Sequence, residues 1–143
     1  MVSIRTEIFL EHPAERVWGI LADFDRYSEW NPLNIQAKGQ ARLGARVPMT
    51  FLNPASPGKT IRQTVKVTTF EPGKALAWSG SIPLLFNGRH HFELVTEANG
   101  VRLLHGEDLG GWIGNRFTPD QIQRDFVPHY EGVNRALAQR LAA

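Results

Sequence analysis

Apolar and polar residues alternate over the first ten positions of the chain. The apolar positions of this alternation are Val2, Ile4, Ile8 and Leu10. A period of two is typical of a strand with one buried face. From Pro13 to Ala22 the apolar residues instead recur at spacings of three and four, and proline suits the first position of a helix. This segment therefore predicts a half-buried strand followed by a short amphipathic helix.

The middle of the chain is rich in β-forming residues, and glycine and proline interrupt them at short intervals. We predict six strands there, at residues 33–37, 46–52, 61–70, 75–79, 89–96 and 101–107. Asn99-Gly100 separates the last two, and both residues tolerate the positive φ of a two-residue hairpin turn. With that turn, antiparallel pairing sets Leu94 opposite His105 and Phe92 opposite Glu107.

The last segment returns to a helical period. Thr118 precedes Pro119, which is typical of a capped helix start. An apolar stripe then follows, made of Ile122, Phe126, Tyr130, Val133, Leu137 and Leu141. Pro128 lies inside this pattern and should kink the helix near Arg124, because it removes one hydrogen bond of the helix. We expect a long helix with one apolar face.

An antiparallel sheet with one buried face needs a cover, and the terminal helix has the length and the stripe to provide it. We therefore predict an α+β fold in one domain over residues 1–143. In this fold a curved antiparallel sheet of about seven strands wraps around the C-terminal helix, with two short helices after the first strand.

Composition and charge narrow the function classes. The 143 residues are 42% hydrophobic and 21% charged, which is typical of a globular protein. The net charge is +2, and the arginines are scattered from Arg5 to Arg140, so we expect no nucleic-acid partner. Cysteine is absent, which excludes disulfides and thiol nucleophiles. The start of the chain has no apolar run of signal-peptide length, so we expect a cytoplasmic protein without stable membrane insertion.

Two stretches of the sequence resemble a known superfamily. HPAERVWGILADFDRYSEWNPL resembles the N-terminal segment of SRPBCC proteins, the START-like helix-grip superfamily that includes polyketide cyclases and dehydrases. GRHHFELVTEANGVRLLHGEDLGG is similar to the late hairpin of these proteins. The resemblance implies a helix-grip fold around an internal cavity. It also implies that Phe24, Tyr27 and Trp30 brace one end of the sheet against the terminal helix, with Trp30 and Asn31 near the cavity rim.

The predicted hairpin places three titratable side chains on one face. His90 shares the parity of Phe92, so His90, His105 and Glu107 should gather at one end of an apolar surface. They could satisfy one another and nearby backbone, or a bulge near Gly88 or Gly106 could turn one outward. Alternatively they contact a ligand, or His105 and Glu107 act as acid and base. We expect His105→Ala and Glu107→Gln to alter ligand binding without unfolding the protein.

The remaining ligand-binding candidates come from alternation on the other strands and from the helix stripe. The full set is Trp30, Asn31, Met49, Phe51, Gln63, Trp78, His90, Phe92, Phe126 and Tyr130. Gln63 differs from its neighbours, because an amide on an apolar parity needs a hydrogen-bond partner such as Tyr130 or a ligand. His90 and His91 should point to opposite faces, and no metal-binding spacing is present, so we expect no metal and no cofactor.

Three functions are compatible with this sequence. The leading one is the binding of a hydrophobic or aromatic small molecule in a cavity between the sheet and the C-terminal helix. The second is a cofactor-independent cyclase or dehydrase. The third is a protein-interaction module with a filled core, which predicts no cavity and an exposed apolar patch. The GGWIGN stretch, residues 110–115, should lie at the cavity mouth or simply connect strand to helix. The protein should be a monomer or a homodimer.

Overall fold

The computed structural model describes all residues from 1 to 143 and contains one seven-stranded antiparallel sheet. The strand order across the sheet is β1-β7-β6-β5-β4-β3-β2. The strands are β1 (Val2–Leu10), β2 (Asn34–Ala37), β3 (Arg46–Leu52), β4 (Thr60–Glu71), β5 (Ala75–Ile82), β6 (Phe86–Glu97) and β7 (Gly100–Gly110). All six strands predicted for the middle of the chain are present, and most extend beyond the predicted bounds.

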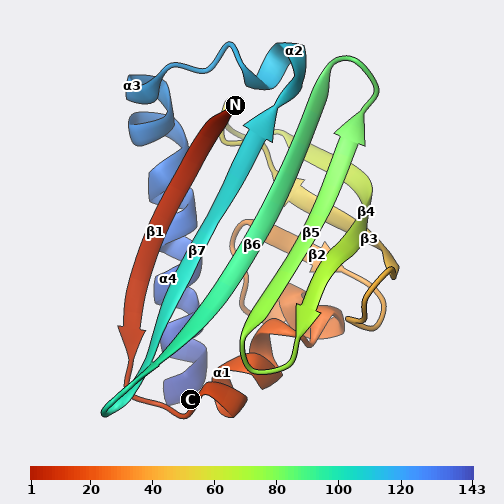
Figure 1. The fold of residues 1–143 in the computed structure, drawn as a ribbon. Helices are drawn as coiled ribbons and strands as arrows, with labels where there is room; N and C mark the ends of the chain where they lie inside the picture. The colour runs from red at the N-terminus through yellow and green to blue at the C-terminus, as the bar shows by residue number, and fades with distance from the viewer.

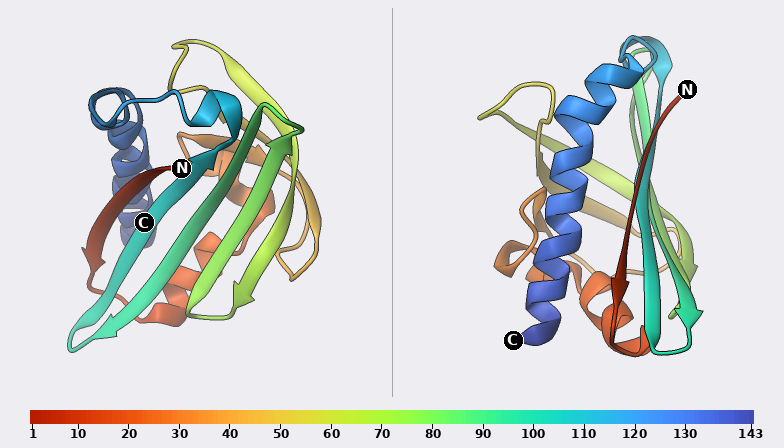
Figure 2. Two further views of the ribbon diagram at one scale, coloured as in Figure 1. Left: turned by 45° about the horizontal axis from the view of Figure 1, so that its top comes forward. Right: turned by 90° about the vertical axis from the view of Figure 1, so that its left-hand side faces the viewer.

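The sheet curls around the C-terminal helix α4 (Val127–Ala142), as Figures 1 and 2 show. Two short helices, α1 (Ala14–Leu21) and the 3₁₀ helix η1 (Phe24–Glu29), connect β1 to β2. The predicted helix-grip fold is therefore confirmed. No helix is both long enough and apolar enough to cross a membrane.

The aromatic residues of η1 pack against the sheet. The rings of Phe24 and Tyr27 lie 5.5 and 6.4 Å from the ring of Trp78 on β5, and Tyr27 also contacts Trp30 edge to face. The Tyr27 hydroxyl donates to the carbonyl of Leu21 over 2.6 Å, which ties η1 to the end of α1. Burial of these rings contributes on the order of 2 kcal/mol each to folding.

The C-terminal segment begins with α3 (Pro119–Gln121), continues through the π-helix η2 (Ile122–Phe126) and ends with α4. The Thr118 hydroxyl accepts from the N–H of Gln121, as the capping pattern predicts. The N–H of Val127 bonds to the carbonyl of Ile122, five residues earlier. Because Pro128 has no N–H for the carbonyl of Arg124, the regular α-helical hydrogen bonding is interrupted at the place predicted for the kink, and this wider turn forms there. All six residues of the predicted apolar stripe are buried.

The predicted hairpin register is wrong by two residues. Glu97 pairs with Gly100, so the turn consists of Ala98 and Asn99, neither of which has positive φ. A Cβ on Gly100 would lie 2.1 Å from the carbonyl oxygen of Leu10. Gly100 is therefore required for a close approach to β1 and belongs to the strand. A shift of two residues preserves parity, so each side chain keeps its predicted face.

Candidate functional site

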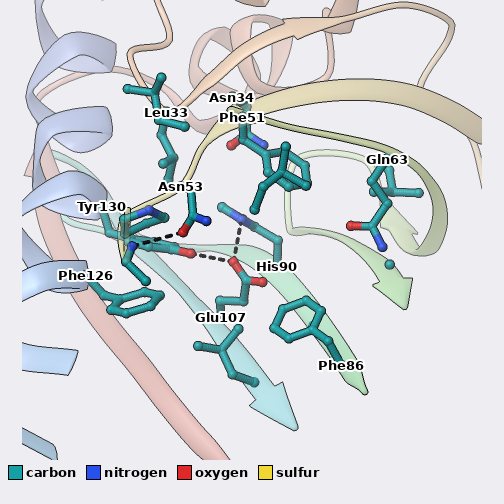
Figure 3. Close-up of a pocket in the computed structure, with 18 of the residues that line it drawn as sticks. Leu33, Asn34, Phe51, Asn53, Gln63, Phe86, His90, Glu107, Phe126 and Tyr130 are labelled. Atoms are coloured by element: carbon teal, nitrogen blue, oxygen red, sulfur yellow. Dashed lines mark hydrogen bonds and ion pairs between the residues drawn. The ribbon is translucent and has the colours of Figure 1, made fainter. Parts of the chain in front are cut away.

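A cavity of about 460 Å³ lies between the sheet and the C-terminal segment. Of its 23 lining residues, 14 are hydrophobic, so the walls are largely apolar. They come from β2 to β7, the β3–β4 loop, α2 (Gly111–Gly114), η2 and α4. Figure 3 shows Glu107 between His90 and Tyr130 at one side of this space, with Phe86 and Phe126 nearby.

Two paired glycines make room for polar side chains on the cavity wall. Gly80 and Gly88 face each other across β5 and β6. A Cβ on Gly80 would lie 2.6 Å from the side-chain amide of Gln63, and a Cβ on Gly88 would lie 2.5 Å from Oε2 of Glu107. Any larger residue at either position would displace the amide or the carboxyl group.

The polar side of the cavity is built around the Glu107 carboxyl group. The Tyr130 hydroxyl donates to Glu107 Oε1 over 2.5 Å, and His90 Nδ1 lies 3.2 Å from the same oxygen. The His90 ring is stacked between Trp78 and Tyr130, with ring centroids 4.9 and 5.4 Å away. Its exposed fraction is 5%, so its position is fixed by packing on both faces.

A hydrogen-bonded chain continues from His90 into the core. His90 Nε2 lies 2.7 Å from His105 Nε2, and His105 Nδ1 lies 2.8 Å from Asn134 Oδ1 on α4. Asn134 Nδ2 donates to the hydroxyl of Thr6 on β1 over 2.9 Å, and that hydroxyl donates to the carbonyl of His105 over 2.7 Å. The chain therefore links three elements: the β6–β7 hairpin, α4 and β1.

This chain determines the tautomer of both histidines. A carbonyl only accepts, so Thr6 donates to it and its oxygen accepts from the Asn134 amide nitrogen. Asn134 Oδ1 therefore faces His105 Nδ1, which must carry the proton. His105 Nε2 is then an acceptor, and His90 Nε2 must carry a proton and donate to it.

The contact between His90 Nδ1 and Glu107 Oε1 requires one proton on one of these two atoms. Without it, a nitrogen lone pair and a carboxylate oxygen would face each other at 3.2 Å. A proton on either atom turns this contact into a hydrogen bond. The charges of His90 and Glu107 sum to zero in both cases.

The surrounding groups stay uncharged. Burial lowers the pKa of His105 well below its usual value, and the nearby His90 lowers it further. Burial and the adjacent Glu107 raise the pKa of Tyr130 well above its usual value, so its hydroxyl remains a donor. The His105 ring and the Tyr130 hydroxyl therefore act as uncharged hydrogen-bond partners of His90 and Glu107.

The comparisons with known proteins agree with this architecture. The model of the family described as "Polyketide cyclase / dehydrase and lipid transport" matches residues 1–142. The chain belongs to this family. No curated protein matches the chain.

Solved structures share the fold at low sequence identity. A START superfamily protein from Mycobacterium smegmatis has a TM-score of 0.78 and 14% identity, and the match covers 98% of this chain and 97% of that one. The Zhui aromatase/cyclase from Streptomyces sp. R1128 has a TM-score of 0.75 and 15% identity, with 99% and 93% covered. For DynU16, from the dynemicin biosynthetic locus, the TM-score is 0.73 and the identity 16%. The match covers 99% of this chain but only 47% of DynU16, so the chain spans about half its length.

In this member of the polyketide cyclase/dehydrase and lipid transport family, the cavity brings together part of the set expected from the sequence. The expected residues that line it are Phe51, Gln63, Trp78, His90, Glu107, Phe126 and Tyr130. Tyr130 hydrogen-bonds to Glu107 rather than to Gln63. Neither of the bulges considered near Gly88 and Gly106 is present, because the β6–β7 register is unbroken.

The other five expected residues lie outside the cavity lining. His105 is behind His90, and Phe92 stacks on the His105 ring at 4.4 Å. Asn31 Oδ1 accepts from the N–H groups of Leu33 and Asn34, so it shapes the turn into β2. Of the remaining two, Met49 belongs to the buried core, and the partly buried Trp30 packs against that core.

Several cavity and chain residues were not anticipated from the sequence. The β3–β4 loop contributes Asn53 to Ser56, and the buried Asn34 also lines the cavity. Asn134 was not predicted as a site residue, because the apolar stripe alone defined the inner face of the terminal helix. Its position, four residues after Tyr130, was the available indication that it shares the inner face.

Exposed apolar residues lie on α2 and on the β5–β6 turn, and one of them reaches the cavity. Ile113 on α2 lines the cavity, as proposed for the GGWIGN stretch, and its N–H bonds to the carbonyl of Leu85 in the β5–β6 turn. Trp112 and Leu84 are 67% and 96% exposed, and Leu84 has a φ of 68°.

His91 points to the opposite face of the sheet from His90, and no group of three His, Cys, Asp or Glu residues is arranged to hold a metal ion.

Proposed function

We propose that the protein binds a hydrophobic or aromatic small molecule in the cavity between the sheet and the C-terminal helix. The supporting observation is a largely apolar space of about 460 Å³ with one buried polar wall. This volume lies within the range of small-molecule sites, and a few convergent polar groups in an apolar pocket orient a ligand. A filled-core interaction module predicts no such space.

A neutral fluorescent dye, N-phenyl-1-naphthylamine, tests this proposal. Ile61→Trp places an indole in the cavity wall, whereas Thr64→Trp places one on the exposed side of the same strand. We expect the first variant to bind the dye at least about tenfold more weakly and the second to match the unsubstituted protein. Equal affinity in all three proteins, or no binding by any, would contradict the proposal. Native mass spectrometry of the purified protein would then identify any molecule that co-purifies.

A second candidate is acid–base catalysis on the bound molecule, in the manner of a cyclase or dehydrase. The single proton shared by His90 and Glu107 at the cavity wall favours it, because such a pair can accept a proton from an activated carbon acid and return it. His90, rather than His105, faces the ligand space. His105 would act as a positioning residue through its hydrogen bond to His90.

Deuterium uptake at the acidic C–H of a soluble aromatic 1,3-diketone tests this role by mass spectrometry. We expect the protein to accelerate uptake and Glu107→Gln to reduce the acceleration by about 100-fold or more. Glu107→Gln should still bind the dye, although with an altered affinity, and this remaining binding separates lost chemistry from a lost cavity. If the unsubstituted protein binds the diketone without accelerating uptake, the catalytic candidate is wrong and the binding function stands.

A further inference from the structure

Positive charge is concentrated in one part of this chain. Residues 31–92 contain eight basic side chains and a single acidic one, Glu71. Because the whole chain has sixteen basic and fourteen acidic residues, the rest carries eight basic and thirteen acidic ones. The basic residues are spread along the chain, as expected, but the scarcity of acidic residues between 31 and 92 leaves a net positive charge there.

The fold gathers five of these cations on the convex face of the sheet. Lys38 directly follows β2, Arg46 is on β3, Arg62 and Lys66 are on β4, and Arg89 is on β6; each is exposed and lies next to a buried or half-buried residue. None of them forms an ion pair, and Arg89 only donates to the hydroxyl of Thr69 over 3.2 Å. Figure 2 shows α4 on the other side of the sheet, so no helix covers this basic face.

A polar groove of about 430 Å³ runs across the basic face on β2, β3 and β4. Lys38 and Arg62 line it together with Gln36, Thr50 and Thr64. Ammonium, guanidinium, hydroxyl and amide groups all donate hydrogen bonds to oxyanions. The groove is therefore suited to negatively charged oxygen atoms.

Two of the cations on the basic face lie close enough to repel each other. Arg46 and Lys66 are directly opposite each other in the β3–β4 register. Like charges in that arrangement destabilise a sheet. A local loss of folding stability that no other contact offsets is typical of residues that serve binding rather than folding.

We propose that the basic face is a docking surface for an extended acidic segment of a partner protein. Its charge complements a run of Asp and Glu carboxylates, and a flexible segment can follow a convex surface. Single-stranded nucleic acid would need exposed aromatic rings for stacking, and these five positions provide none. A convex sheet also cannot enter a duplex groove as a helix or ribbon does. A bilayer would require inserted apolar side chains, which this face lacks between its cations.

The test uses a fluorescein-labelled peptide of alternating glutamate and serine, and measures its anisotropy at low and physiological salt. Lys38→Glu/Arg62→Glu reverses two charges in the groove. Lys74→Glu/Arg135→Glu reverses two exposed, unpaired charges elsewhere, on the β4–β5 turn and on α4. We expect salt-sensitive binding that weakens about tenfold in the first variant and little in the second. All three proteins should bind N-phenyl-1-naphthylamine equally, because none of the four positions lines the cavity.

Three outcomes would overturn the proposal. The peptide could fail to bind, or the two variants could lose affinity equally, which would indicate only general attraction to a cationic protein. A 20-base-pair DNA duplex or vesicles with phosphatidylserine could bind more tightly than the peptide and lose that binding in the groove variant alone. That result would assign the basic face to nucleic acid or to an anionic membrane instead.

Discussion

At the scale of single residues, Asn134 sets the protonation pattern of two histidines although it contacts only one of them. Its amide is oriented by Thr6, it holds the proton on His105 Nδ1, and His105 in turn makes His90 a donor at Nε2. The polar wall of the cavity therefore depends on a side chain that does not line it.

The sequence predicted that His90, His105 and Glu107 share a face, because parity follows from alternation. Which of them reaches the cavity depends on the packing of α4 against β7, and no local pattern contains that information.

Replacing Asn134 tests this dependence. In Asn134→Leu the Nδ1–H of buried His105 loses its side-chain acceptor, so we expect the free energy of unfolding to fall by about 1 to 3 kcal/mol. We also expect the ¹⁵N shifts of both histidines to report a changed tautomer. Asn134→Asp keeps an acceptor for His105 Nδ1 but removes the donor to Thr6, so we expect Nδ1 to stay protonated. Unchanged histidine shifts in Asn134→Leu would mean that the tautomers have another origin.

At the scale of elements, the sequence predicted most of the fold because strands, caps and the terminal helix are encoded locally. The strand at 46–52 matches β3, and the apolar stripe of the terminal helix is buried throughout. The β6–β7 register could not be predicted in the same way. It depends on the contact between Gly100 and the Leu10 carbonyl, which joins positions ninety residues apart.

Substitution at this turn checks the corrected register. In Gly100→Ala the added Cβ would meet the Leu10 carbonyl oxygen, so we expect a loss of at least about 2 kcal/mol of unfolding free energy. Asn99→Ala should cost less than about 1 kcal/mol, because its φ is not positive. Chemical denaturation measures both values. Similar losses for the two variants would count against the observed turn.

The facing cations on β3 and β4 give a second prediction at this scale. Arg46→Glu places an acidic side chain opposite Lys66, so we expect the unfolding free energy to rise by about 0.2 to 1 kcal/mol at low salt. The gain should shrink as sodium chloride is added, because the pair is exposed. Arg46→Gln is the control that removes the repulsion without adding attraction. A loss of stability in Arg46→Glu would show that the two side chains do not interact.

At the scale of the whole molecule, stability should depend on pH through two histidines that fold in their neutral form. Burial, helped by Arg5, lowers the pKa of His91 to about 4, and burial lowers the pKa of His105 well below its usual value. Above about pH 6.5 both are neutral in the folded and the unfolded chain. Below that pH the unfolded chain binds protons that the folded chain does not, so the folded state loses stability as the pH falls.

Urea unfolding at intervals between pH 7.5 and 4.5 measures this effect. We expect the unfolding free energy to be nearly constant above about pH 6.5 and to decline below it. His91→Asn removes one of the two groups and should flatten the decline. A profile that is unchanged by His91→Asn would mean that His91 titrates alike in both states.

The neutral pair formed by His90 and Glu107 also determines how a charged guest can enter the cavity. Because the two charges cancel, the walls offer no counter-ion to a carboxylate or a phenolate, and moving an unpaired ion out of water is costly. We therefore expect an acidic guest to be carried in its protonated form. Its uptake would then draw one proton from the solvent, and its apparent affinity would fall about tenfold for each pH unit above its own pKa.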